Sequence, residues 1–226
     1  MTLPIFFLSH TFSFTLVFPH SFGDLSSALG NDLPEGVRPL LTTEGRPLKT
    51  FVPEEAIFLN DAKTLDGFLK KVEGQPPDWK FLFGSNVEER YDRLFDEMEK
   101  RDSARAGNPT LNQSVAFLWD GDLTSFRPQH NGFGVAIGPR QLPSPWGIVR
   151  FKIANQPSEM VAIPSSNLLP TLEKKRSAGE PVEITILFIG KLLPEESFMY
   201  DFSTVEEGEG MILPVVNVKQ IYYYLE

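Results

Sequence analysis

The chain of 226 residues lacks cysteine and carries 21 lysines and arginines against 30 aspartates and glutamates, a net charge of −9. The absence of cysteine excludes disulfide scaffolds, thiolate metal sites and thiol catalysis, and the negative charge disfavours nucleic acid as a partner because it repels phosphate backbones. Hydrophobic residues make up 41% and charged residues 23%, proportions of an ordinary globular protein that exclude wholesale disorder and coiled coil.

The N-terminal segment is the most apolar stretch of the chain and has no charged residue before Asp24. Residues 3–18 are too few and too polar for a membrane span. Small residues at Ser21 and Gly23 precede a cleavage point before Asp24, so we predict a signal peptide over residues 1–23 and an extracytoplasmic, periplasmic or secreted protein. The alternative is a core strand of a cytoplasmic protein, because the aromatic residues of this segment alternate with polar ones.

The segment after the predicted signal peptide contains little regular periodicity until residue 60. Residues 24–53 are rich in glycine, proline and charge, which predicts an irregular stretch. Apolar residues between Ala62 and Val72 recur at helical spacing, and Gly74 follows them, so we predict a short amphipathic helix. Residues 79–83, with the sequence WKFLF, predict a short strand ending at Gly84.

The strongest helical pattern begins at Asn86, which is followed by a glutamate in the capping-box position. We expect its apolar face to pack against the core and its charged face, with both signs interspersed, to lie in solvent. The apolar face comprises Val87, Tyr91, Leu94, Phe95 and Met98.

Residues 102–113 have the composition of a linker, and strand patterns dominate after them. We therefore predict an α+β protein with a helix-containing lobe over residues 24–107 and an antiparallel β-rich lobe over residues 108–226. One helix near Asn167 interrupts the later strands. The order of elements fits a small barrel, such as the OB-fold, or a curved sheet covered by one helix.

The sharpest chemical motif is the sequence VAFLWDGDLT at residues 115–124. An apolar strand that delivers Asp120 and Asp122 together offers oxygen ligands of the kind that Mg²⁺ prefers. The motif resembles the first motif of the haloacid-dehalogenase phosphotransferases, a strand followed by Asp-x-Asp-x-Thr. The resemblance implies that Asp120 is a nucleophile, that Asp122 is a general acid and that Mg²⁺ is the cofactor. We nevertheless expect Asp120-Gly121-Asp122 to form a polar turn that closes the strand, with the phosphotransferase site as the alternative.

Aromatic and cationic residues of the second lobe are candidates for a ligand groove, although such aromatics also serve in cores. These candidates are Trp119, Arg127, His130, Trp146 and Arg150.

The sequence as a whole favours a soluble, acidic binding or interaction protein without catalytic activity or cofactor, whose partner is a protein or a small molecule. The first alternative is the Mg²⁺-dependent phosphotransferase. The second is a structural or assembly protein that uses the aromatic C-terminal strand around Tyr222, Tyr223 and Tyr224.

Overall fold

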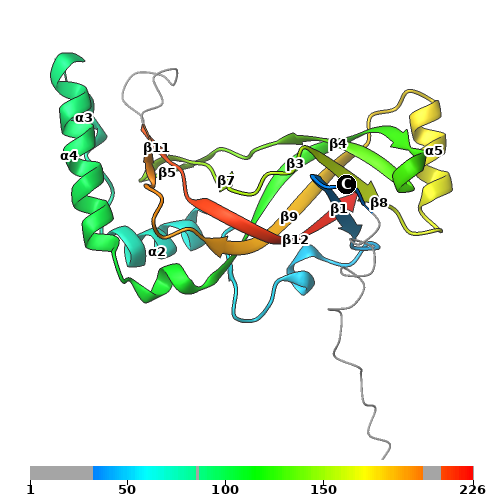
Figure 1. Ribbon diagram of the computed structural model, residues 1–226, viewed down its shortest axis with the longest axis horizontal. Helices are drawn as coiled ribbons and strands as arrows, with labels where there is room; N and C mark the ends of the chain where they lie inside the picture. Colours follow the sequence, from blue (N-terminus) through cyan, green and yellow to red (C-terminus); the bar gives the residue numbers. More distant parts are fainter. Residues whose placement is uncertain (1–32, 85–86, 201–209, 226) are drawn as a thin grey trace, which may run out of the picture.

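The computed structural model describes residues 33–84, 87–200 and 210–225 (Figure 1). The chain is an α+β protein built on a six-stranded barrel, which confirms the predicted fold class. Going round the barrel, the strands are β1 (Val37–Thr42), β8 (Glu159–Ile163), β4 (Gly132–Gly138), β3 (Ser114–Arg127), β9 (Glu183–Leu192) and β12 (Val215–Leu225). Pairing of β1 with β12 closes the barrel.

Strand β1 comes from the stretch that the sequence predicted to be irregular, and this expectation was wrong. It pairs in parallel with both β8 and β12, through Pro39 opposite Val161 and Leu41 opposite Tyr222, whereas the other barrel strands are antiparallel to their neighbours. Only Leu40 of β1 is fully buried. The strand therefore lacks the alternation that identifies strands in a sequence, because its position depends on the two strand edges that it joins.

Strand β3 is longer than predicted and runs straight through Asp120-Gly121-Asp122, so no turn closes it there. This part of β3 pairs with β4 on one side and β9 on the other. A Cβ atom on Gly121 would come within 2.9 Å of both the Ala136 carbonyl oxygen and Ile186 Cδ1. Glycine here permits close packing between strands rather than a change of direction.

One end of the barrel carries helices α2 (Ala62–Glu73), α3 (Trp79–Phe83) and α4 (Val87–Arg105). The α3 segment was predicted as a strand, and this was wrong. Asp78 accepts a hydrogen bond from the Phe81 amide at 3.0 Å and so caps a helical turn. Trp79 and Leu82, three residues apart, are the buried side chains of that turn.

A small second sheet lies beside these helices. Its strands, in spatial order, are β10 (Met199–Tyr200), β11 (Met211–Ile212), β6 (Gly147–Val149) and β5 (Leu142–Ser144). Trp79 Nε1 donates to the Trp146 carbonyl oxygen at 2.9 Å, and Trp146 Nε1 donates to Asp66 Oδ1 at 3.0 Å. Hydrogen bonds from Lys70 and then from Trp146 lower the pKa of Asp66. The two tryptophans thus join α2 and α3 to the second sheet.

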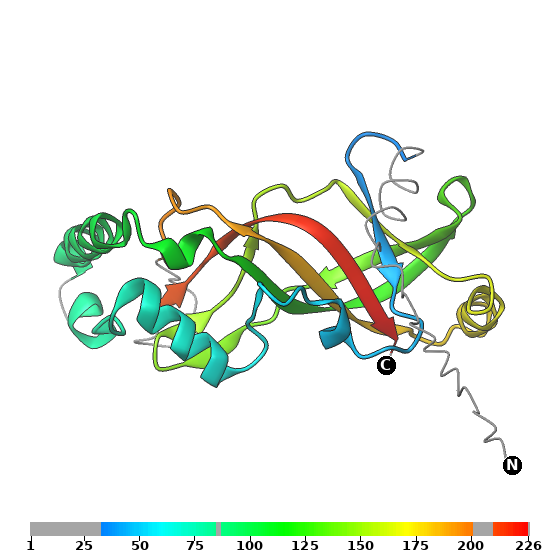
Figure 2. The same cartoon turned by 90° about the horizontal axis from the view of Figure 1, so that it is seen from below.

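The remaining elements are η1 (Leu48–Phe51), β2 (Ile57–Phe58), η2 (Pro109–Asn112), η3 (Pro128–His130), β7 (Lys152–Ile153) and α5 (Leu169–Ser177). Helix α5 lies at the end of the molecule opposite α3 and α4 (Figures 1 and 2). In the described ranges, every helix is too short or too polar to cross a membrane.

The main hydrophobic core contains side chains from both predicted lobes, among them Leu65 and Phe68 of α2 and Phe117 and Phe188 of the barrel. Helix α4 extends into the predicted linker, residues 102–113, as far as Arg105. The division of the chain at residues 107/108 stays a prediction. The predicted signal peptide, residues 1–23, lies outside the described residues.

Candidate functional site

Asp120 and Asp122 lie side by side on the outer surface of β3, because residues two apart in a strand share a face. Both side chains are exposed. Asp120 forms a fork with Arg140, whose Nε lies 2.8 Å from Oδ1 and 2.9 Å from Oδ2, and Nη2 also donates to Oδ1. The phosphotransferase resemblance implies that Asp120 is the nucleophile. In the structure, this carboxylate instead forms an ion pair with the Arg140 guanidinium.

Asp122 stands opposite Glu183 of β9, on the other side from β4. With Asp120, these residues line an open depression of about 340 Å³ that also includes Ala136 and Gly138. In the part of the chain that the structure describes, no group of three or more His, Asp or Glu side chains is arranged to hold a metal ion. Chemically, the depression presents carboxylates to solvent with one guanidinium at its edge.

Two of the predicted ligand-binding residues, Trp119 and Trp146, are buried in the core. The Trp119 ring packs edge-on against Phe188, with centroids 5.0 Å apart, inside the barrel. Trp146 makes the hydrogen bonds to Asp66 and Trp79 described above. Both side chains thus contribute to packing, and their predicted role in ligand binding stays a prediction.

The other three predicted binding residues lie on separate elements. Arg127 Nε donates to Glu159 Oε1 at 2.9 Å and lines a depression of about 360 Å³. His130 is the last residue of η3 and is half-buried. Arg150 follows β6, where its amide donates to the Ile212 carbonyl oxygen at 3.0 Å. Arg127 and the Asp120 pair line different depressions.

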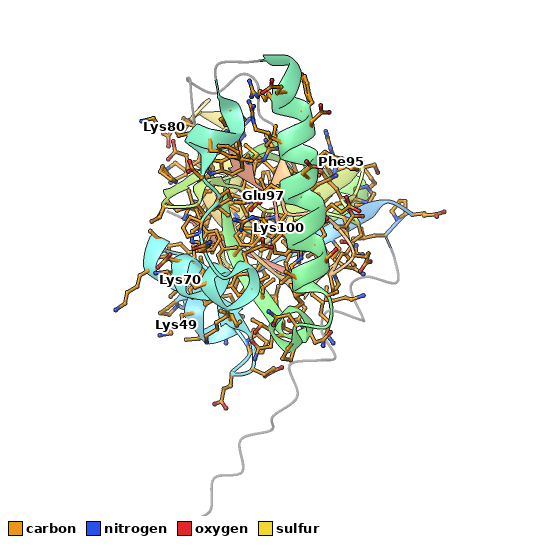
Figure 3. All side chains as sticks on the ribbon, turned by 90° about the vertical axis from the view of Figure 1, so that its left-hand side faces the viewer. Lys49, Lys70, Lys80, Phe95, Glu97 and Lys100 are labelled. Atoms are coloured by element: carbon orange, nitrogen blue, oxygen red, sulfur yellow. The ribbon has the colours of Figure 1, made fainter. Side chains whose placement is uncertain are left out.

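The α3–α4 hairpin carries the large hydrophobic side chains that are most exposed in the described residues. Phe81, Tyr91 and Phe95 are 65%, 63% and 65% exposed. The hairpin projects from the end of the barrel, and Phe95 lies on the side of α4 away from α3 (Figure 3). Exposed aromatic side chains on a projecting element are typical of surfaces that bind other proteins.

Tyr91 and Phe95 are one helical turn apart and form a single exposed patch with the acidic side chains around them. We call this patch the aromatic–acidic face of α4; it comprises Tyr91, Asp92, Phe95, Asp96 and Glu99. Phe81 lies elsewhere, because its ring is 5.8 Å from the Arg93 guanidinium and residue 93 is about 200° around the helix from residue 95.

A cluster of buried charges fastens the base of α4 to the rest of the molecule. Arg105 donates through Nη2 to the Glu196 carbonyl oxygen at 2.9 Å and lies 4.3 Å from the Phe198 ring centroid. Arg101 donates through Nη1 to the Gln75 carbonyl oxygen at 2.9 Å and through Nε to Glu97 at 2.6 Å. Both arginines also pair with Glu73 of α2.

Two glutamates bind Arg101, and Glu97 is more exposed than Glu73. The charged form of Glu97 is favoured. Partial burial acts to raise the pKa of Glu97, but the hydrogen bonds from Arg101 and Lys100 outweigh it and lower the pKa. Glu97 is therefore charged at neutral pH.

The predicted apolar face of α4 is only partly correct, because Leu94 and Met98 pack against the core but Tyr91 and Phe95 do not. The stripe that packs inward contains Leu94, Met98, Arg101 and Arg105, whereas Tyr91 and Phe95 face solvent. The residues of the inward stripe have regular helical spacing. Because the C-terminal half of the stripe consists of arginines, hydrophobic periodicity did not reveal it. The sequence signal for this inward stripe is the pair of arginines, four residues apart, that continues the helical spacing after Leu94 and Met98.

Searches against models of protein families, against curated proteins and against solved structures found no significant match to this chain. Function is therefore argued from the surfaces of the molecule itself.

Proposed function

We propose that the chain is a non-catalytic binding protein that docks a partner protein on the aromatic–acidic face of α4. The observation that carries the proposal is the exposure of Tyr91 and Phe95 on a hairpin that projects from the barrel. Aromatic side chains dominate the energetics of protein interfaces, because each removes a large apolar area from water on binding. Burial of two such side chains against a partner would therefore favour association.

The anchored base of the hairpin supports this role. The ion pairs of Arg101 and Arg105 with Glu73 hold α4 against α2. A rigid presenting element loses less conformational entropy when a partner binds, so more of the interaction free energy appears as affinity.

The surroundings of the two aromatics define the chemistry of the partner. Asp92, Asp96 and Glu99 are exposed on the same face. Within the described residues, neither Asp92 nor Asp96 forms an ion pair. The matching surface is therefore apolar at its centre and cationic around it, because complementary charge guides association and excludes other partners.

The test replaces Phe95 with the photo-crosslinking residue p-benzoylphenylalanine in the native host. Phe81, of the same type and the same 65% exposure but on the other side of the hairpin, is the matched control position. We expect a discrete crosslinked product from position 95 that position 81 does not give, and that Asp92→Lys with Asp96→Lys removes. The partner, identified by its mass and then purified, should bind the unmodified chain and lose at least about tenfold in affinity against Phe95→Ser.

Equal crosslinking from positions 81 and 95, or a purified partner that binds Phe95→Ser as tightly as the unmodified chain, would contradict the proposal.

A further inference from the structure

The end of the molecule opposite the hairpin has an apolar depression of about 250 Å³ beside α5. Cavities of about 150 Å³ admit a benzene ring, so an aromatic side chain fits in this one. Its apolar walls are Leu168, Leu172, Pro181, Val182 and Leu225, and its polar residues are Thr171, Lys175 and Glu183. The depression therefore lies between α5, the beginning of β9 and the end of β12.

The last turn of α5 is cationic and contributes one side chain to the lining of this depression. Lys174, Lys175 and Arg176 are consecutive in that turn, and Lys175 lines the depression itself. Lys174 and Lys175 are exposed, and neither forms an ion pair with any described residue. Glu183 faces the depression from β9, so an acidic ligand is favoured only on the α5 side.

The two ends of the molecule are complementary. One end presents exposed aromatic rings beside the unpaired carboxylates of Asp92 and Asp96, and the other presents an apolar depression beside the unpaired ammonium groups of Lys174 and Lys175. A ring entering the depression would leave water at the same time as the flanking charges come together.

We propose that the partner of the aromatic–acidic face is a second copy of this chain, with Phe95 inserted into the depression beside α5 and the α4 carboxylates next to Lys174 and Lys175. The inference rests on the proposed function and names its partner. Because the two surfaces lie at opposite ends of the molecule (Figures 1 and 2), the contact is head-to-tail. Repeating it adds further copies in a filament or closes a ring.

Sedimentation velocity of the purified chain over a wide concentration range tests the proposal. The average mass should rise with concentration, and added salt should weaken the association because the flanking charges are exposed. Phe95→Ser and Lys175→Glu should each raise the dissociation constant of self-association by about tenfold or more. Phe81→Ser and Lys49→Glu, at exposed positions outside both surfaces, should leave it unchanged.

Mixing the two defective variants identifies the geometry of the contact. Phe95→Ser retains an intact depression and Lys175→Glu retains an intact α4 face, so their mixture has one working contact per pair. We expect one-to-one dimers and no larger species. The charge swap Asp96→Lys with Lys175→Glu in one chain should restore part of the self-association that Lys175→Glu loses.

Three results would overturn the inference: a wild-type chain that stays monomeric at every concentration, self-association that Phe95→Ser leaves unchanged, or dimers formed by Lys175→Glu alone, which indicate a symmetric contact. A monomeric chain that still crosslinks through position 95 to a different protein overturns the self-association and leaves the proposed function standing. Unchanged circular dichroism and melting temperature of each variant ensure that the surface, not the fold, was altered.

Discussion

Arg105 Nη1 donates to Glu73 Oε1 at 2.5 Å, and the two side chains are only 2% and 0% exposed. Arg101 reaches the other oxygen of the same carboxylate, with its Nη1 3.4 Å from Oε2. One carboxylate of α2 thus pairs with two arginines of α4 away from water, and Glu97 and Asp102 each supply one of these arginines with a second carboxylate. Such a group of charges stabilises the fold only while every member is present, because a lone buried charge has lost its hydration without compensation.

Removing the shared carboxylate should therefore destabilise the protein strongly. We expect Glu73→Ala to lower the free energy of unfolding by about 3–5 kcal/mol, because it removes the fully buried carboxylate that the two arginines share and leaves them only the more exposed Glu97 and Asp102. Urea denaturation followed by circular dichroism measures this. Glu99→Ala, at an exposed position of α4, is the control and should change stability by less than about 0.5 kcal/mol. A similarly small effect of both substitutions would show that the ion pairs do not anchor the helix.

Substitution of two glycines by alanine should change the free energy of unfolding in opposite directions. A Cβ atom on Gly190 of β9 would lie 2.4 Å from the Asn217 carbonyl oxygen, so Gly190→Ala should lower the free energy of unfolding by about 1–3 kcal/mol. A Cβ atom on Gly67 of α2 meets nothing within 4 Å. Gly67→Ala should raise stability by about 0.5–1 kcal/mol through helix propensity. Thermal denaturation of the pair measures both, and the same sign of change in both would contradict the packing described for β9.

Tyr223 makes stability depend on alkaline pH. Its side chain is buried in the barrel, and this burial raises its pKa to about 12. In the unfolded chain the pKa is about 10. The folded state therefore disfavours the phenolate. The stabilisation is fully present below about pH 10 and is lost as pH rises through 12.

The comparison of Tyr223→Phe with the unmodified chain isolates this effect. Between about pH 9 and about pH 11.5 the free energy of unfolding should fall less in the variant, because phenylalanine has no proton to lose. Tyr91→Phe, at an exposed position, is the control and should follow the unmodified chain. An equal fall in Tyr223→Phe and the unmodified chain would show that Tyr223 titrates normally.

The phosphotransferase alternative is tested at Asp120. Because Arg140 holds this carboxylate at an exposed position of β3, we expect Mg²⁺ to leave the melting temperature unchanged. Asp120→Asn should change stability by less than about 1 kcal/mol, as for surface ion pairs generally. Differential scanning fluorimetry with and without Mg²⁺ measures both. A rise in melting temperature with Mg²⁺ that Asp120→Asn abolishes, together with phosphatase activity, would establish the enzyme instead.

Export is tested by the intact mass of the protein purified from its native host. We propose cleavage between Gly23 and Asp24 and an extracytoplasmic location, on the apolar and uncharged character of residues 1–23. The expected mass is that of residues 24–226. Retention of the whole segment in a protease-resistant form would show that it is part of the fold.

The sequence alone determined the α+β class and the positions of α2 and α5, and it predicted a small barrel as one of two architectures for the strands. These follow from local patterns, since a continuous run of β-branched and other apolar residues marks a buried strand such as β9. A cap such as Asp61, which accepts hydrogen bonds from two amides at 2.9 Å, marks a helix start. Such signals involve residues that are close in the sequence, so they can be recognised without knowledge of the fold.

Tertiary structure decided the features on which the proposed function depends. The inward face of α4 is set by Glu73, which lies 32 residues before Arg105 in the chain, so no local window contains the reason that two arginines are buried. The place of β1 depends on β8 and β12, and the continuity of β3 through Gly121 depends on strands packed on both sides. Partners that are distant in the sequence allow Arg101 and Arg105 to be buried, whereas the aromatic side chains of α4 stay in solvent. The burial of a side chain thus depends on the groups that it contacts and not on its polarity alone.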